Sequence, residues 1–330
     1  MRQEPFETLY APLWDRLERQ LSGFENPAGN QKSPRTASDD PALFPGYYKI
    51  VCNHYALARS RHYSPALVMR LHQLVLRGHR QLYRPDRAWL RKTIAFIGSD
   101  FPRTLRQHAA VFYLALTIFM IPAAVTGYVT YHDPVMIYRI MDEAQVSRVE
   151  YMYDPRNRKP GRDMERTSET NVRMFGFYIF NNISIGFRAF AGGMLLGLGT
   201  VFALLFNGLF LGAISGHLSH APYAMVFWPF VSGHGAFELT AIVISGAAGL
   251  LLARALVMPG ALTRRGALRK IAPQALKLVM GAAFMLLIAA FIEAFWSPSS
   301  FSPQVRLSVA AVNWTLVIAY FIRAGKKHES

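Results

Sequence analysis

Uncharged apolar stretches long enough to cross a membrane dominate the sequence after residue 108. The first, residues 109–131, carries no charged side chain, and the 43 residues from Met174 to Gly216 contain only one, Arg188. A single helical span needs about 20 apolar residues, whereas a soluble domain distributes its apolar residues in short periodic runs. The sequence therefore predicts an all-α fold, a polytopic membrane helix bundle.

The charge distribution indicates which segments face the cytoplasm. The net charge is +16, and basic residues concentrate in residues 1–107, in residues 254–277 and in the C-terminal tail. Basic loops stay on the cytoplasmic side of a membrane, so all three segments are predicted to be cytoplasmic. The single cysteine, Cys52, excludes a disulfide framework within one chain. The N-terminus lacks the apolar core of a cleaved signal peptide, so we expect the first span to direct insertion.

Cytoplasmic flanks on both sides require an even number of crossings between residues 108 and 254. The long apolar stretch then holds two spans, which meet at the Ala-Gly-Gly of residues 191–193. The total is six spans, predicted at residues 109–131, 174–193, 196–216, 230–253, 277–296 and 305–322.

An alternative count has five spans. In it, residues 175–188 lie in the interface or form a re-entrant helix, because Asn181, Ser184 and Arg188 make a polar stripe on one helix face.

Residues 1–107 are predicted to form a basic cytoplasmic α-helical domain, interrupted by a linker at 22–44 that is rich in Gly, Pro, Ser and Asn. Helical spacing of apolar residues predicts helices at 4–21 and 47–61, and the Ser-Pro pair at 64–65 marks the start of a third. Residues 108–325 are the predicted transmembrane bundle. Its loop, residues 132–173, has balanced charge that suits the extracytoplasmic side and includes a short amphipathic helix.

His234 and Glu238 lie inside an apolar span, four residues apart and so on one helix face. Charged side chains in the hydrocarbon region cost roughly 2.5–3.5 kcal/mol each, so both are expected to face other helices. Trp228 and Trp296 mark one headgroup level on two antiparallel neighbours. Counted from these tryptophans, His234 and Glu293 differ in depth by roughly 5 Å. We therefore expect these two side chains to lie close together.

This polar cluster has two open interpretations. It binds a cation or relays protons, or it is a hydrogen-bonded group that fixes helix packing. No metal ligand and no cofactor is assigned, because His-x-x-x-Glu lacks the second histidine of the zinc helix, and His217 and His220 are placed in a loop. No catalytic residue is assigned either, since Ser232 and Ser245 have no elbow or triad context.

Other polar residues and five glycines complete the candidate set. Asn181, Asn182 and Asn207 need hydrogen-bond partners when buried, either across helices or on a substrate. Arg188 is expected to snorkel to the cytoplasmic face or to pair with a glutamate of the cluster. Small residues four apart allow close helix packing, within the chain or between subunits; these are Gly193, Gly197, Gly208, Gly212 and Gly216.

Three stretches resemble the stage II sporulation protein M family of integral membrane proteins. They are "MFGFYIFNNISIGFRAFAGGMLLGLGTVFALLFNGLFLGAISG", "FWPFVSGHGAFELTAIVISGAAGL" and "AAFIEAFWSP". The section "YYKIVCNHYALARSRHYSPALVMRLHQLV" is similar to the cytoplasmic extension of longer members. The resemblance implies a multi-pass inner-membrane protein, and the family's namesake acts as a scaffold with peptidoglycan hydrolases. Of the candidate residues, these fall on the family motifs: Asn181, Asn182, Asn207, Gly208, His234, Glu238 and Glu293.

The function expected from the sequence is a non-enzymatic inner-membrane scaffold or assembly protein. We expect it to be homo-oligomeric, with cytoplasmic or cell-wall-related protein partners, the lipid bilayer around it and no nucleic acid. The first alternative is a transporter or channel for an ion, a proton or a lipid that uses His234, Glu238 and Glu293. A weaker alternative is an intramembrane metal-dependent hydrolase.

Overall fold

The computed structural model describes residues 2–25, 41–83, 88–156 and 168–326, and these residues form helices and turns without a strand. The predicted all-α class is therefore confirmed for the described residues. The chain divides into two compact units, Met1–Trp89 and Leu90–Ser330. Most of the predicted linker, residues 26–40, lies outside the described residues, as does the loop at 157–167.

The N-terminal unit packs three helices around large apolar side chains. The helices are α1 (Gln3–Glu25), α2 (Phe44–Ser60) and α3 (Pro65–Leu82). They agree with the predicted helices to within four residues at each end. Ser64 caps α3 as predicted, since its side chain accepts a hydrogen bond from the backbone N–H of Leu67. The buried cluster includes Phe6, Trp14, Leu17 and Leu71.

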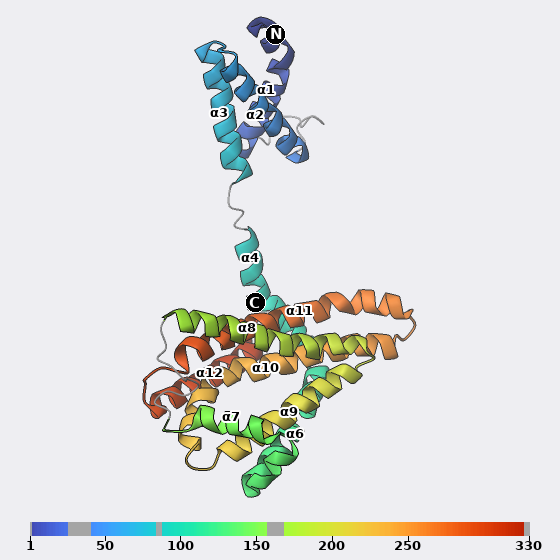
Figure 1. Cartoon of the computed structure of the whole chain (residues 1–330). Helices are drawn as coiled ribbons and strands as arrows, with labels where there is room; N and C mark the ends of the chain where they lie inside the picture. The colour runs from blue at the N-terminus through green and yellow to red at the C-terminus, as the bar shows by residue number, and fades with distance from the viewer. Residues whose placement is uncertain (1, 26–40, 84–87, 157–167, 327–330) are drawn as a thin grey trace. The chain divides into compact units, whose positions relative to one another are not determined.

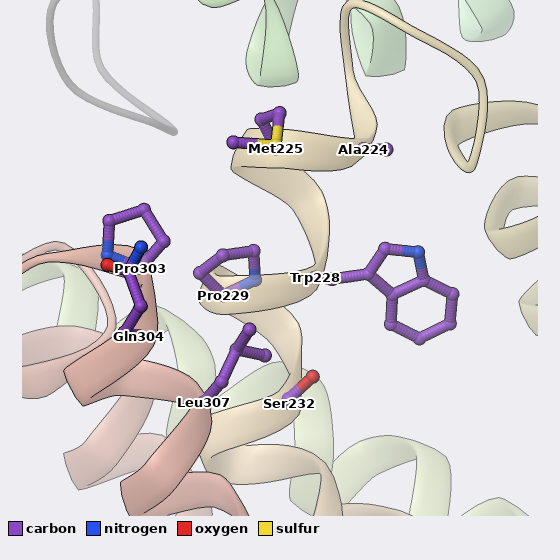
Figure 2. Close-up of a pocket in the computed structure, with 8 residues that line it drawn as sticks. All are labelled: Ala224, Met225, Trp228, Pro229, Ser232, Pro303, Gln304 and Leu307. Carbon is purple, nitrogen blue, oxygen red and sulfur yellow. The ribbon is translucent and has the colours of Figure 1, made fainter.

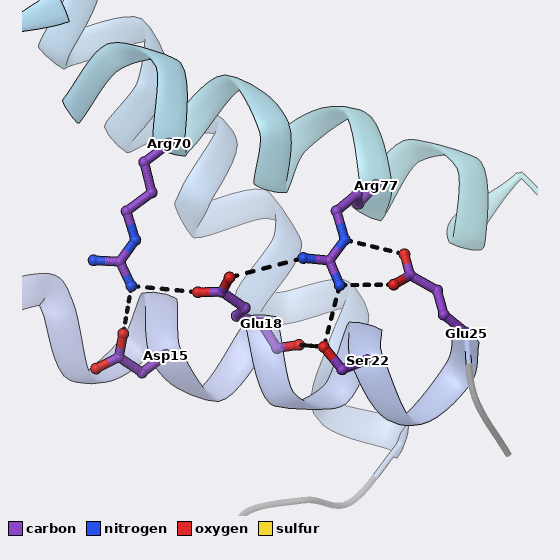
Figure 3. A network of polar contacts seen from close by, with 6 residues as sticks. All are labelled: Asp15, Glu18, Ser22, Glu25, Arg70 and Arg77. Atoms are coloured by element: carbon purple, nitrogen blue, oxygen red, sulfur yellow. Dashed lines mark hydrogen bonds and ion pairs between the residues drawn. The ribbon is translucent and has the colours of Figure 1, made fainter. Parts of the chain in front are cut away.

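Ion pairs cross the surface between α1 and α3 (Figure 3). Arg77 donates to both carboxylate oxygens of Glu25, at 3.0 and 2.7 Å, and Arg70 contacts Asp15 and Glu18. The hydrogen bond from Arg77 lowers the pKa of the Glu25 carboxyl. These charges stay at the surface while the apolar side chains are inside, which is the arrangement of a unit surrounded by water.

Residues 96–107 pack with the bundle, whereas the sequence placed them in the N-terminal domain. They form the π-helical turn η4 (Phe96–Asp100) and α5 (Phe101–Gln107), which follow α4 (Ala88–Ala95). Phe101 and Leu105 are buried in the same apolar cluster as Leu278 and Val317. The boundary therefore moves to residue 89 because α5 supplies part of the bundle core.

Each predicted span corresponds to a helix of the second unit. The helices are α6 (Ala109–His132), α8 (Ser168–Ala191), α9 (Leu198–Leu218), α10 (Ala224–Val257), α11 (Arg264–Phe291) and α12 (Pro303–Arg323). Five are long and apolar enough to cross a membrane; α8 is not among them. The break after α8 lies where the sequence predicts it, at the 3₁₀ turn η6 (Gly192–Met194). The choice between six spans and five stays a prediction.

The contacts of α8 define its course through the bundle. It packs against α10 and α11, and Figure 1 shows these three helices side by side. Near its start, Phe175 meets Phe295, and near its end the carbonyl of Ala189 accepts from Thr200. A Cβ atom on Gly193, just beyond α8, would meet the backbone of Gly249 in α10. The helix thus runs from the Trp296 end of the bundle to the opposite end.

The basic segments meet at that opposite end. Arg106 of α5 donates to the carbonyl of Phe321 in α12, and His108 is hydrogen-bonded to Gln274 of α11. Tyr320 donates to the carbonyl of Ile97. Segments assigned to the cytoplasm from their charge are therefore neighbours at one end of this unit.

Residues 133–153 of the predicted extracytoplasmic loop form two short helical elements. These are the 3₁₀ turn η5 (Pro134–Arg139) and the helix α7 (Glu143–Tyr153). A capping box starts α7, in which Asp142 and Gln145 bond to each other's backbone N–H. The helix places Tyr153 against the first turns of α10.

Candidate functional site

The helix α10 carries His234 and Glu238 on one face, facing the bundle. His234 is 4% exposed, and its Nε2 atom lies 3.7 Å from a carboxylate oxygen of Glu238. The i, i+4 spacing within α10 (Ala224–Val257) aligns the two side chains. Other helices cover that face, so both side chains point into the bundle, as the sequence predicts.

Glu293 approaches from η7 (Ile292–Trp296), a π-helical turn that continues α11. One ligand atom each from His234, Glu238 and Glu293 lies within 4.8 Å of the others. The structure therefore brings His234 and Glu293 together, as the depths of the two tryptophans predict. A π-helical turn changes the direction of side chains within a helix and is frequent at functional sites.

Hydrogen bonds from neighbouring segments orient the cluster. Asn182 of α8, 1% exposed, donates to Glu293 at 3.5 Å. The Nδ1 atom of His234 is 3.1 Å from the hydroxyl of Ser297, directly after η7. The buried Arg306 of α12 donates to the carbonyl of Ser297 at 3.2 Å. Four helical segments, α8, α10, η7 and α12, thus meet at one polar centre.

Tyr153 of α7 covers the cluster from the loop side. Its ring contacts Phe227 and Phe230 edge-on, and Phe230 in turn contacts the ring of His234. Burial raises the pKa of the Tyr153 hydroxyl, and the negative charge of Glu293 raises it further. Tyr153 is thus linked to the cluster through the ring of Phe230.

The other polar residues proposed from the sequence lie apart from this centre or at its edge. Asn181 is exposed and donates to the side chain of Asn182, so it reaches the cluster only through that neighbour. Asn207 donates to the carbonyl of Ala203 within its own helix. Arg188 is exposed on α8.

The glycines on α9 lie in the contact between α9 and α6. A Cβ atom at Gly208, Gly212 or Gly216 would be 2.2 Å from a carbonyl oxygen of α6, at Phe119, Ala123 and Gly127 respectively. Residue numbers rise together along both helices, so α6 and α9 run parallel. Gly193 packs on α10, and Gly197 starts α9 with a φ of 89°. Close packing within one chain occupies the glycine faces that the sequence left open to subunit contact.

A second histidine–glutamate pair joins α9 to α7. His217 is buried, and its Nε2 atom is 2.7 Å from Glu150 of α7. The sequence places His217 in a loop, whereas the structure has it within the last turn of α9. His220 follows the helix and bonds to the carbonyl of Tyr131.

A pocket of about 550 Å³ lies between the first turns of α10 and α12 (Figure 2). Apolar side chains dominate it, with Ser232 and Gln304 as its polar members. No titratable residue is among its lining residues Ala224, Met225, Trp228, Pro229, Ser232, Pro303, Gln304 and Leu307. The polar chemistry of this region therefore belongs to the buried cluster and not to this pocket.

Tyr153, Ser297 and Arg306 are the site residues that the sequence analysis missed. Tyr153 ends a loop helix, and Ser297 lies in a turn, so periodicity within a span does not mark either residue. Arg306 had one usable signal, because it stands as a lone charge near the start of an apolar helix.

Comparison with known proteins identifies two matching families. Residues 110–298 match the model described as Stage II sporulation protein M, and residues 4–84 match one described as Domain of unknown function (DUF8413). The chain is similar to "Uncharacterized protein MJ0793" of Methanocaldococcus jannaschii, at 30% identity over 133 residues, 38% of this chain and 71% of that protein. No solved structure matches. The first match includes His234, Glu238 and Glu293.

Proposed function

Because the chain belongs to the stage II sporulation protein M family of membrane proteins, we propose that it is a non-enzymatic membrane scaffold or assembly protein. One observation carries the proposal: a helical unit with its own core and a charged surface is joined to a bundle of apolar helices. The bundle would anchor the chain, and the N-terminal unit would hold a protein partner in the cytoplasm.

The exposed face of α3 supports docking by the N-terminal unit. Met69, Leu76 and Tyr83 follow one another at seven-residue intervals and are 61%, 42% and 67% exposed. Apolar residues seven apart lie on one helix face, as do the anchors by which an amphipathic helix binds a partner. We propose that an amphipathic helix of a cytoplasmic or cell-wall-related protein occupies this stripe.

Site-specific crosslinking in cells tests the docking proposal. A photoreactive residue at Met69 or Leu76 of the full chain should form an adduct with a second protein. The matched control is the exposed Asn53 on α2, where we expect several-fold less of the same adduct. Equal yields at all three positions, or no protein adduct, would contradict the proposal.

We also propose six membrane crossings in an inner membrane, with both termini in the cytoplasm. The parallel course of α6 and α9 supports this topology, because the chain must return between them and α8 is the segment that does so. In a chain with Cys52 replaced by Ser, single cysteines at Asn171 and Leu195 should react from opposite sides of the membrane. Reaction of both from one side would favour five spans.

Assembly into a homo-oligomer remains part of the proposal. Its support is a pair of stacked aromatic rings on the outside of α9, Phe202 and Phe206, which are 67% and 47% exposed. Mass photometry in lipid nanodiscs should give a multiple of one chain's mass, reduced by Phe206→Ala. A single chain per nanodisc over the measurable concentration range would oppose it.

A transporter or channel for an ion or a proton is the second candidate, favoured by the buried His234, Glu238 and Glu293. In proteoliposomes, a transporter should lose flux in Glu238→Gln and His234→Ala variants that still insert. A scaffold should keep its protein adducts in both variants and lose only stability.

A further inference from the structure

We propose that His234, Glu238 and Glu293 bind one divalent transition-metal ion, for which Zn²⁺ is the fitting species. The ion would tie α10 to η7 inside the bundle. This goes beyond the scaffold proposal and does not depend on it, since a scaffold needs no metal.

The geometry of the three side chains is close to that of a ligand set. Zinc lies about 2.0–2.2 Å from nitrogen and oxygen ligands, so two ligands of one ion are at most about 4.2 Å apart. The Nε2 atom of His234 and the nearest oxygen of Glu238 are 3.7 Å apart, within that limit. All three ligand atoms lie within 4.8 Å of one another. Rotation of the Glu293 or Glu238 side chain that brings the widest pair about 0.6 Å closer, from 4.8 Å to about 4.2 Å, would complete the set.

The distance between His234 and Glu238 is also too long for a hydrogen bond. Donor–acceptor distances of N–H···O bonds are about 2.7–3.2 Å. His217 and Glu150, at 2.7 Å, show what a directly bonded pair in the same unit looks like. The wider spacing at His234 is what two ligands of a common ion require.

The donor types select the metal. Imidazole nitrogen favours zinc, iron and other transition metals, whereas calcium and magnesium favour oxygen ligands alone. Burying carboxylates in the hydrocarbon region is costly, and a divalent ion would cancel the formal charge of Glu238 and Glu293. Three protein ligands also leave one position of a tetrahedral zinc ion open.

Independent support comes from the residues behind the ligands. A metal-bound histidine almost always makes a hydrogen bond through its other ring nitrogen, and ligating carboxylates are hydrogen-bonded in turn. Here Nδ1 of His234 is bonded to Ser297, which leaves Nε2 directed at Glu238. Asn182 donates to Glu293. Both ligands thus have the outer partners that metal sites require.

The sequence assigns no metal ligand because His-x-x-x-Glu lacks the second histidine of a zinc helix. Two ligands do come from one helix at i, i+4 spacing, but the third comes from a π-helical turn 55 residues further along the chain. The depths of Trp228 and Trp296 predict that Glu293 lies near His234, and the fold brings it within reach of both other ligands.

Metal content of the full-length protein tests the proposal. The protein, purified through a tag without histidine and stripped with a chelator, is loaded with Zn²⁺ in lipid nanodiscs and desalted. We expect about one zinc per chain, with X-ray absorption showing nitrogen and oxygen ligands at about 2.0–2.2 Å. Glu293→Gln and His234→Ala should each lower the content below a tenth of an equivalent.

Two further sets of variants separate ligation from folding. His217→Ala removes an equally buried histidine of a two-residue pair and should retain one zinc per chain. Ser297→Ala and Asn182→Ala should weaken zinc binding by about 10- to 100-fold without abolishing it. If Glu293→Gln and His234→Ala do not fold, the stoichiometry and X-ray absorption of the unaltered protein decide alone.

The proposal fails if the unaltered protein takes up no stoichiometric zinc at neutral pH, which would leave a shared proton as the link between these residues. Equal zinc loss in the His217→Ala variant would also overturn it, as would full retention in folded His234→Ala. None of these outcomes changes the crosslinks expected of a scaffold, so the two proposals fail separately.

Discussion

The two units of this chain differ in the kinds of side chain that they bury and expose. In the N-terminal unit the largest fully buried side chains include Trp14, Phe6 and Leu17, and the ion pairs are on the surface. In the bundle, alanine and glycine fill the contacts, polar groups are inside, and large apolar side chains such as Ile121 and Leu198 are 58% and 75% exposed. This is the difference expected between a unit that folds in water and a unit that folds in lipid.

The largest effect is expected where two helices of the bundle touch. Gly212→Ala would place a Cβ atom 2.2 Å from the carbonyl of Ala123, and backbone cannot yield as a side chain can. We expect most of this variant to aggregate in size-exclusion chromatography in detergent. At Gly176 of α8 a Cβ atom meets nothing within 4 Å, so Gly176→Ala should be neutral or gain up to about 1 kcal/mol. Similar profiles for both variants would refute the close contact of α6 and α9.

A core truncation in the other unit should act on that unit alone. Leu17→Ala removes a fully buried side chain of α1 and should cost about 2–5 kcal/mol. Hydrogen exchange of the full-length protein should then rise in α1, α2 and α3 and stay unchanged in the bundle. Leu9→Ala, on the same helix but 59% exposed, should remain within about 0.5 kcal/mol of the unaltered chain. Loss of protection in the bundle as well would mean that the two units do not fold independently.

The same substitution, to lysine, at one exposed position in each unit compares the surroundings of the two units. Ile121 of α6 and Met69 of α3 are 58% and 61% exposed. Lysine at residue 121 should cost roughly 2.5–3.5 kcal/mol on insertion because that face meets lipid. Lysine at residue 69 should change stability by no more than about 0.5 kcal/mol. A glycosylation-based insertion assay measures the first and hydrogen exchange the second; equal small effects would place α6 in water.

The smallest expected effect is a pH dependence confined to the N-terminal unit. Burial lowers the pKa of His54, whose Nδ1 atom accepts a hydrogen bond from Trp14. Below about pH 6.5 the unfolded chain binds a proton that the folded unit excludes. The free energy of unfolding should therefore be largest above pH 6.5 and fall as the pH drops toward the lowered pKa.

Hydrogen exchange at pH 7.5 and 5.5, corrected for intrinsic rates, measures this effect. His54→Gln keeps an acceptor for Trp14 and should flatten the dependence. An unchanged slope in that variant would assign the effect to another group.

Helices and their ends were predictable from local chemistry. Apolar length marks α6, α9, α10, α11 and α12, the Ala-Gly-Gly sequence marks the end of α8, and Ser64 with Pro65 marks the start of α3. The proximity of His234 and Glu293 was predictable from two tryptophans. Tryptophans mark the headgroup level, so counting residues from them gives the depth of a side chain in the membrane.

The other contacts of the site could not be predicted from the sequence, because they depend on which helix faces pack against each other. Asn181 and Asn182 are adjacent, yet only Asn182 faces Glu293. Nothing local shows that Asn207 bonds to its own helix, or that α5 packs against α11 and leaves the N-terminal domain. Ser297 reaches His234 because η7 redirects the chain after α11.

The most direct test is a structure of the full-length protein in a lipid nanodisc. We expect lipid density around Ile121 and Leu198. His234, Glu238 and Glu293 should lie together inside the bundle, shielded from the lipid. Acyl chains against those three side chains, or a well-separated His234 and Glu293, would contradict the account.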